Sequence, residues 1–319
     1  MSKNPKEQPP ENLTGIKLTE VPKTSVGVKA IVSALSHIKN EVGVTKGIQL
    51  LSKINQTDGF DCPGCAWPDP DDKRAFLAEY CENGAKAIAE EATKNKVSPM
   101  FFEMNSVQEL SELSDYEIGK SGRITHPMFL AEGETHYKEI SWKKAFKMIG
   151  DKLNSLDSPD EAIFYTSGRT SNEAAFLYQL FVRQFGTNNL PDCSNMCHES
   201  SGSALSETLG IGKGSVTLND FNHADLVIVM GQNPGTNHPR MLTALSETKK
   251  NGGKIMTINP LPEVGLMRYN DPQNPLKWIG KGQQLTDLFL QVKINGDVAL
   301  LKIILKLIYL SGQKTNKRN

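Results

Sequence analysis

The chain has 319 residues, 38% of them hydrophobic, and is long enough to bury one large core or two smaller ones. Lys and Arg together number 36, as do Asp and Glu, so the formal net charge is zero. This balance gives no overall field that would attract nucleic acid or an anionic membrane, and we expect neither as a partner.

The N-terminus is polar and contains several prolines. Residues 1–12 have neither the apolar stretch of a secretory signal nor a twin-arginine pair. We therefore expect a disordered lead-in and a cytoplasmic protein. Residues 13–60 mix short apolar stretches with glycines and predict no firm element.

Two helices are predicted in the first half of the chain. Apolar side chains spaced for one face predict a helix over residues 73–96. A second helix, over residues 142–156, is expected to begin after the capping residue Ser141.

From residue 162 onward, strand and helix patterns alternate. Residues 162–166 form a short β-rich run. Thr170 and Glu173 have capping-box spacing before an apolar helix that ends at Gly186, and a short helix is expected over residues 204–209.

A βαβ pattern follows. The β-branched run at 225–230 predicts a strand buried on both faces, Pro239 begins a helix that ends near Lys250, and residues 254–258 predict the next strand. Strand, helix and strand at this spacing indicate an α/β fold with a parallel sheet.

The longest apolar run lies at residues 298–310. It is too short to span a bilayer, which needs about 20 residues. Lys302 and Lys306 fall on one helical face, so we expect a helix that packs in the core and exposes this one face to solvent.

Three cysteines near the N-terminus form a candidate metal site. Cys62 and Cys65 have the spacing that zinc and iron–sulfur sites both use, and Cys81 adds a third thiolate. Asp69 is the nearest hard ligand that could complete the set. Iron–sulfur, zinc and a metal-free redox or structural turn all remain open.

Two further features could carry chemistry. Cys197 could ligate a soft metal beside His198 as a proton acceptor, although a packing cysteine is the simpler reading. The loop at residues 231–239 joins a strand to a helix and could hold an anionic group, or could be a turn without a ligand.

Together and in this order, these features resemble the molybdopterin-dependent oxidoreductase superfamily, specifically the formate dehydrogenase-like α subunits. Residues 62–70 resemble an oxidoreductase branch of it. The resemblance runs from about Cys62 to Leu310 and is carried by Cys62, Cys65 and Cys81, and by residues 122–127, 141–142, 166–173, 186–190, 197–198 and 226–239.

The resemblance implies two cofactors. Cys62, Cys65 and Cys81 would bind a [4Fe–4S] cluster, with Asp69 as a further ligand where the family has a cysteine. Cys197 would ligate the molybdenum of a bis(molybdopterin guanine dinucleotide).

The resemblance also assigns roles to residues around these groups. His198 would move protons, and Lys86 would lie between cluster and pterin. The residues that would hold one guanine dinucleotide are Gly231, Asn233, Pro234, His238 and Asn259.

The chain departs from the family in three further ways. Glu199 and Ser200 stand where formate enzymes have Gly-Pro, and Leu261 stands where the family often has arginine. Members also run to more than twice this length. We therefore expect a chain truncated relative to the family, with a second polypeptide as partner.

The resemblance divides the chain into three parts. Residues 1–50 are the partly disordered lead-in, residues 51–135 a small N-terminal iron–sulfur subdomain, and residues 136–319 an incomplete α/β molybdopterin-binding domain.

The implied function is a molybdopterin-dependent oxidoreductase that takes electrons from a small-molecule donor and passes them through molybdenum bis-pterin and an iron–sulfur cluster. Two alternatives remain. One is a fragment that is inactive or requires a partner; the other is a zinc-stabilised α/β binding protein.

Overall fold

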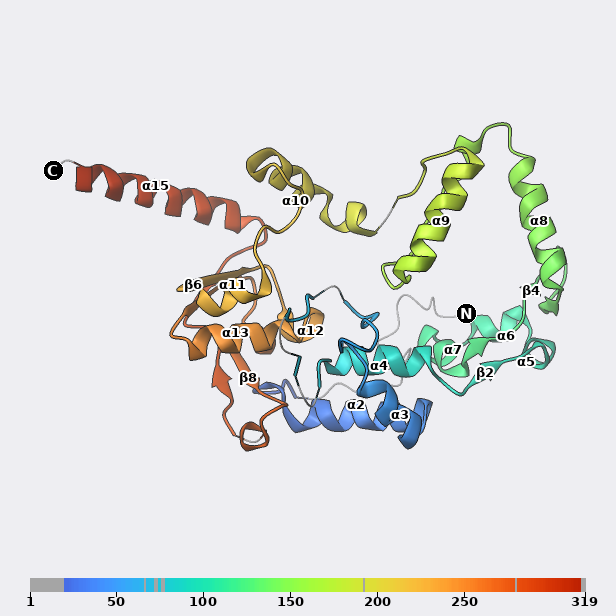
Figure 1. Cartoon of the computed structure of the whole chain (residues 1–319), viewed down its shortest axis with the longest axis horizontal. Helices are drawn as coiled ribbons and strands as arrows, with labels where there is room; N and C mark the ends of the chain where they lie inside the picture. Colours follow the sequence, from blue (N-terminus) through green and yellow to red (C-terminus); the bar gives the residue numbers. More distant parts are fainter. Residues whose placement is uncertain are drawn as a thin grey trace, which may run out of the picture.

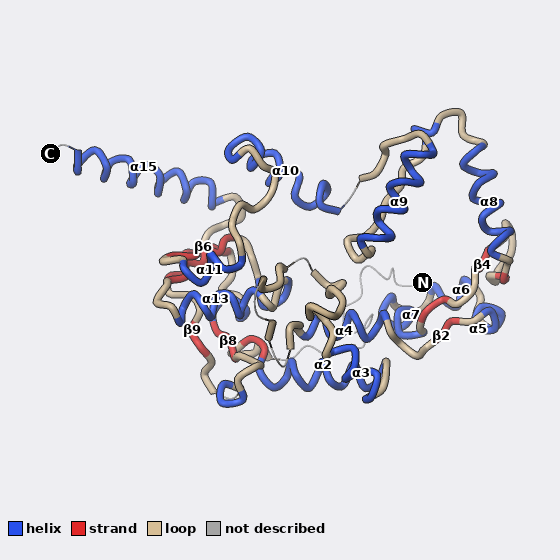
Figure 2. The backbone as a smooth tube through the Cα atoms, viewed as in Figure 1, coloured by secondary structure: helices blue, strands red, loops and turns tan. Residues whose placement is uncertain are grey.

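The computed structural model describes residues 20–65, 67–71, 74–75, 78–191, 193–278 and 280–316, and describes the backbone alone at 193–197, 275 and 313–316. The predicted lead-in of residues 1–12 lies outside them. Helices and small sheets alternate along the chain, which confirms the α/β class (Figure 1, Figure 2).

Three helices pack together near the N-terminus. The short strand β1 (Ser25–Val26) leads into α2 (Gly27–Glu41) and α3 (Val44–Leu51), and α4 (Glu82–Glu91) packs on α2. Buried side chains of these helices form one core together with Ile54, which follows α3; the core consists of Ala34, Ile38, Leu51, Ile54, Ala85, Ile88 and Ala89.

The helix predicted over residues 73–96 is much shorter in the structure. Residues 74, 75 and 78–80 are not helical, and α4 begins only at Glu82. The thiol of Cys81 accepts the Gly84 amide and caps the helix there. Apolar spacing alone could not show where this cap would fall.

Residues 96–139 form short elements. Capping boxes stabilise the starts of two of the helices, at Ser106 with Glu109 and at Ser114 with Glu117. The elements are β2 (Lys96–Val97), α5 (Pro99–Met104), α6 (Val107–Ser111), α7 (Asp115–Ser121), β3 (Arg123–Ile124), β4 (Met128–Phe129) and β5 (Lys138–Glu139). β2 pairs with β3, and β4 with β5.

Two helices then project away from the other elements: α8 (Trp142–Asn154) and α9 (Asn172–Phe185) (Figure 1). Ser141 caps α8 as predicted. Gly186 ends α9 in the left-handed region, with φ 111°. The cap of α9 is Ser171 rather than the predicted Thr170.

The strand predicted over residues 162–166 is wrong. This segment follows the 3₁₀ turn η2 (Pro159–Glu161) and is extended, and the Phe164 amide donates to the Asn189 carbonyl oxygen at 2.9 Å. No ladder forms there among the described residues. A β-rich run becomes a strand only when another strand lies beside it.

A three-stranded sheet forms the second core. β6 (Leu226–Met230), α13 (Met241–Lys250) and β7 (Lys254–Asn259) follow the predicted order. β7 pairs in parallel with β6 and with β10 (Leu288–Gln291), and α13 packs on α11 (Leu218–His223). The buried side chains are Val227, Val229, Leu242, Leu245, Ile255, Leu266, Tyr269 and Leu285.

β6 differs from its prediction in burial. Val227 and Val229 are buried, but Leu226 and Ile228 on the other face are 49% and 52% exposed. The strand is therefore covered on one face only, not on both.

A second three-stranded sheet ties the two cores together. The elements after β6 and β7 are α12 (Pro234–Asn237), α14 (Val264–Met267), β8 (Arg268–Asn270), η3 (Pro275–Lys277) and β9 (Gln283–Gln284). β8 lies between β1 and β9, and the Ser25 hydroxyl donates to the Arg268 carbonyl oxygen at 2.6 Å.

The last helix, α15 (Gly296–Asn316), extends away from the sheet (Figure 1). Its apolar side chains are exposed, with Leu305 at 65% and Ile308 at 63%, so the predicted burial in the core is wrong for this structure. Among the described helices, none combines the length and apolar character needed to cross a bilayer.

The molecule is open. Its accessible surface is 22681 Å² for a chain of 35.1 kDa, against about 13,000 Å² for a compact monomer of that mass.

Candidate functional site

The cysteine segment lies at the start of α4. The Cys81 sulfur accepts the Gly84 amide at 3.4 Å, and the Cys62 sulfur accepts the Gly64 amide at 3.3 Å. A Cβ on Gly84 would lie 2.8 Å from the Cys62 sulfur and 3.9 Å from that of Cys81. Only glycine lets both sulfurs reach this helix end without displacement.

Burial raises the pKa of the Cys62 and Cys81 thiols, and the charge of Cys65 adds to both shifts. The Cys62 and Cys81 sulfurs both lie within 4 Å of the position that a Cβ on Gly84 would take. A metal would have to displace protons from them, because thiolates are the metal-binding form.

Asn55 holds the two ends of this segment. The buried side chain donates to the Glu79 carbonyl oxygen at 2.7 Å and accepts the Cys62 amide at 2.8 Å. Its φ of 55° is left-handed, a conformation that asparagine tolerates better than most residues. One side chain thus places Cys62 beside the residues that precede Cys81.

Asp69 lies among arginines. Its carboxylate oxygens are 2.7 Å from Arg240 Nη1 and 3.1 Å from Arg74 Nη1. Arg240 also donates to Glu79 Oε1 at 2.6 Å. The Arg240, Asp69 and Glu79 side chains are 12%, 20% and 10% exposed, so these charges pair away from bulk water.

The loop after β6 is built on glycines. Gly231 has φ 63°, and a Cβ on Gly235 would lie 2.5 Å from the Gly265 Cα. This close approach packs α12 directly on α14. Pro234 is fully buried, which fixes the start of α12.

Two asparagines predicted to hold a nucleotide lie at these strand ends. Asn233 Oδ1 is buried and has no hydrogen-bond partner in the described part of the chain. The Asn259 side chain donates to the Leu261 carbonyl oxygen at 2.8 Å. An orphaned buried acceptor is unfavourable unless a ligand donates to it.

The structure brings the cysteine segment and the loop after β6 together. Asn83 on α4 donates to the Thr236 carbonyl oxygen at 2.9 Å. The Trp67 ring centroid lies 6.4 Å from that of His238, and Arg240 joins the same two regions. The sequence did not single out Trp67, Asn83 or Arg240, because no local motif marks a contact between residues this far apart.

Lys86 lies on α4, one turn after Cys81. It is half-buried and pairs with Glu82 at 2.6 Å. The structure therefore places it on the helix that Cys81 caps, with its charge balanced by Glu82.

Cys197 and His198 lie on a separate helix, α10 (Cys193–Leu209). The Cys197 side chain lies outside the described residues. The helix breaks at His198, with φ −123° and ψ 16°, and His198 and Glu199 line an open hollow of about 490 Å³. In Figure 1, α10 stands apart from α4 and α12.

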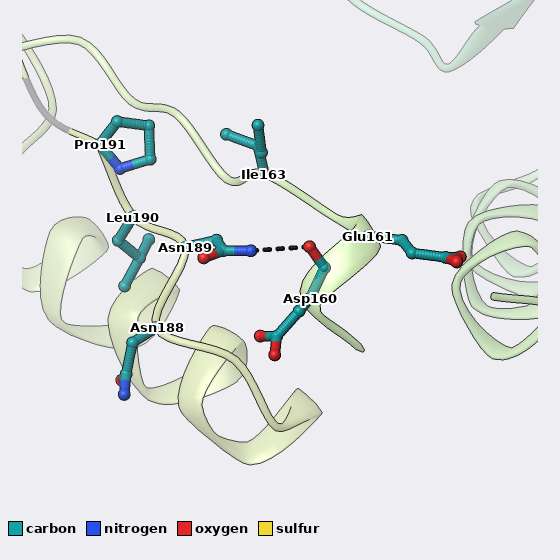
Figure 3. Close-up of a pocket in the computed structure, with 7 residues that line it drawn as sticks. All are labelled: Asp160, Glu161, Ile163, Asn188, Asn189, Leu190 and Pro191. Carbon is teal, nitrogen blue, oxygen red and sulfur yellow. Dashed lines mark hydrogen bonds between the residues drawn. The ribbon is translucent and has the colours of Figure 1, made fainter. Parts of the chain in front are cut away.

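A second hollow, of about 410 Å³, lies beside the loop after α9 (Figure 3). Asn189 donates to the Asp160 carbonyl oxygen at 2.9 Å, and the Thr187 hydroxyl donates to the Asp160 carboxylate at 2.6 Å. These bonds order the segment at residues 186–190.

The thiols near the start of α4 are soft donors, of the kind that bind zinc and iron–sulfur clusters. Among the residues the structure describes, no three Cys, His, Asp or Glu side chains are arranged around one metal position. Zinc ligands must converge on one point, whereas the thiolates of a cluster bind different irons. The Cys62 and Cys81 sulfurs beside Gly84 are two donors of this soft kind. The orphaned Asn233 oxygen suits a ligand with N–H donors.

Sequence comparison identifies the class. The pattern of the family described as Molybdopterin oxidoreductase matches residues 123–298, more than half of the chain. The chain belongs to this family.

Relatives carry the match further. An oxidoreductase of Mycobacterium tuberculosis is 56% identical over 86% of this chain and 35% of its own length. Protein YdeP of Escherichia coli is 48% identical over 88% and 37%. The F420-dependent formate dehydrogenase 2 subunit alpha of Methanococcus maripaludis is 32% identical over 43% and 20%.

The chain spans about a third of the length of the first two relatives. Among solved structures, acetylene hydratase from Pelobacter acetylenicus aligns with a TM-score of 0.37 and 18% identity, over 44% of this chain and 20% of that chain.

Proposed function

We propose that the chain acts in a formate dehydrogenase-like molybdopterin oxidoreductase that takes electrons from a small-molecule donor. The observation that carries this proposal is the contact between the cysteine segment and the loop after β6, through Asn83 with Thr236 and Trp67 with His238. Electron transfer requires a cluster and a pterin to lie close together, and this contact puts their candidate binding elements side by side.

We assign the residues as follows. Cys62, Cys65 and Cys81 would hold an iron–sulfur cluster, with Gly84 leaving room for the sulfurs. Asn233 Oδ1 would accept a hydrogen bond from a pterin or guanine N–H. When bound, molybdenum bis(molybdopterin guanine dinucleotide) supplies two-electron chemistry, and the cluster relays the electrons singly.

The remaining predicted residues have supporting roles. Gly231, Pro234, His238 and Asn259 shape the nucleotide-binding loops, and Lys86 lies on the helix that begins at the cluster. Cys197 would ligate molybdenum, and His198 would accept the proton released from the donor. The exposed hollow at His198 leaves the imidazole accessible to a small molecule.

The test is metal content. The chain is expressed anaerobically in a host that makes the pterin cofactor, together with the part of the Escherichia coli relative that it does not match. We expect both iron and molybdenum in the purified protein, and loss of iron in the Cys62→Ser/Cys81→Ser variant. Neither metal, or zinc in place of iron, would overturn the proposal. Formate-dependent reduction of a dye then tests the donor.

We also propose that the chain needs further polypeptide, equivalent to the part of its relatives that it does not match. Trp142 and Phe146 stack on each other while 62% and 65% exposed, and Phe176 on α9 is 64% exposed. Exposed apolar faces of this size are typical of interfaces.

Co-expression tests this requirement directly. We expect the unmatched part of the relative to elute with the chain in size-exclusion chromatography, and the Trp142→Ser/Phe146→Ser variant to lose it. Separate elution of the wild-type chain would refute the requirement.

A further inference from the structure

We propose that Arg240 is a positioning residue that clamps the cysteine segment onto the loop after β6, and that Asp69 is its ion-pair partner rather than a metal ligand. The inference rests on the proposed function only for the identity of the metal group. The contacts themselves belong to the protein without metal.

The Arg240 guanidinium holds both ends of the segment that joins Cys65 to Cys81. Asp69 lies four residues after Cys65, and Glu79 lies two residues before Cys81. Arg240 contacts the Asp69 carboxylate through Nη1 at 2.7 Å and the Glu79 carboxylate through Nη2 at 2.6 Å. Freeing Arg240 would therefore release both ends at once.

Glu79 is fully engaged in this arrangement. Its other carboxylate oxygen accepts the Ala75 amide at 2.6 Å, and its carbonyl oxygen accepts the Asn55 side chain. Since the residue is only 8% exposed, loss of its cationic partner would leave a poorly hydrated negative charge.

Asp69 is held by charge on both sides. Arg74 lies 3.1 Å from one carboxylate oxygen and Arg240 lies 2.7 Å from the other. The Asp69 oxygen beside Arg240 and the Arg74 nitrogen lack aligned hydrogen bonds, so the attraction is mainly electrostatic. If the Asp69 carboxylate turned to bind iron, Arg74 would lose its ion pair with Asp69, and Arg240 would keep only its ion pair with Glu79.

Arg240 also belongs to the other side of the contact. It is the residue before α13 and lies two residues after His238, whose ring centroid is 6.4 Å from that of Trp67. Its Nη1 reaches the Trp67 carbonyl oxygen at 3.5 Å. The clamp therefore sets the distance between the thiols and the loop that would hold the nucleotide.

Thiol labelling of the metal-free, full-length protein tests the clamp. Iodoacetamide is applied under native conditions, and tryptic peptides are resolved by mass spectrometry. Cleavage after Lys53, Arg74 and Lys86 separates Cys62 and Cys65 from Cys81. Cys81 is the readout, because the charge of Arg240 acts directly on the Cys62 thiol.

We expect Cys81 to be labelled about tenfold faster in Arg240→Gln and in Asp69→Asn, and the double variant to be no faster than the faster single variant. The matched control is Arg123→Gln, which breaks an exposed ion pair with Glu91 at 2.9 Å and should change the rate less than about twofold. If Arg240→Gln fails to fold, Arg240→Lys keeps the charge and is expected to give an intermediate rate.

The ligand role for Asp69 predicts a different pattern. Asp69→Asn would then lower the iron content of the loaded protein, whereas Arg240→Gln would leave the iron content unchanged. Neither substitution would change the labelling rates in the metal-free protein. That result overturns the clamp. Wild-type protein that binds no iron would overturn the proposed function, but the labelling rates would still decide the clamp.

Discussion

The contact of Gly84 with two sulfurs makes a sharp prediction about stability. In an unobstructed helix, Gly→Ala stabilises a protein by about 0.8–1 kcal/mol. At Gly84, however, the added Cβ would lie 2.8 Å from the Cys62 sulfur, and overpacking of this kind costs about 1–3 kcal/mol. We therefore expect Gly84→Ala to be about 0–2 kcal/mol less stable than wild type.

Gly119 in α7 is the matched control. A Cβ there meets nothing within 4 Å, so Gly119→Ala should be about 0.5–1 kcal/mol more stable than wild type. Both variants are compared by urea unfolding of the metal-free protein, followed by circular dichroism. The decisive quantity is the difference between them, about 1–3 kcal/mol. Equal stabilisation by both substitutions would refute the placement of Cys62 against α4.

Three further predictions test other parts of the structure. Burial opposes ionisation of Glu41, but hydrogen bonds from Lys120 at 2.8 Å and from Thr93 at 2.7 Å outweigh this effect and hold the pKa of Glu41 below the ordinary 4.5. These hydrogen bonds therefore stabilise the folded protein above pH 4.5, and this stabilisation is lost as the pH falls through the lowered pKa. Urea midpoints measured from pH 6 to pH 3 should therefore fall less steeply in Glu41→Gln than in wild type, and parallel curves would count against the argument. Gly235→Ala would press a Cβ against the Gly265 backbone and should lower the free energy of unfolding by about 3 kcal/mol, measured in urea. A variant as stable as wild type would mean that α12 does not approach α14 so closely. Thr286→Val removes the hydroxyl that bonds to the buried Thr257 hydroxyl and to the Leu266 carbonyl oxygen, and we expect a loss of about 1–3 kcal/mol in the same assay. Restored stability in the double variant with Thr257→Val would localise the effect to the two threonines.

The sequence predicted the elements whose signals are local. β6, α13 and β7 follow one another within 34 residues, and their pattern needs no distant partner to be recognised. Ser141 and Gly186 marked helix ends because a cap and a left-handed glycine act on their own helix.

Predictions that depended on distant neighbours failed. Residues 162–166 have strand composition but no strand beside them among the described residues, and the apolar face of α15 is exposed. Burial depends on what packs against an element, which periodicity cannot show.

The residues of the candidate site likewise divide into those with a local signal in the sequence and those without one. Cys62, Cys65 and Cys81 were singled out by their spacing, and the loop at Gly231 by its place after a strand. The contact between them was not predictable, because it depends on Arg240, which lies 161 residues from Glu79 and 171 from Asp69 in the sequence. Nothing near Arg240 distinguishes it from an ordinary arginine at a helix start.

The pairing of β1 with β8 has a consequence for synthesis of the chain. Ser25 and Val26 emerge early from the ribosome, but their partners Tyr269 and Asn270 are made about 240 residues later. At about 5–20 residues per second, this interval is roughly 10–50 s. During that time the strand that leads into α2 has no neighbour, so the N-terminal helical unit gains its final tether only when the second sheet has been translated.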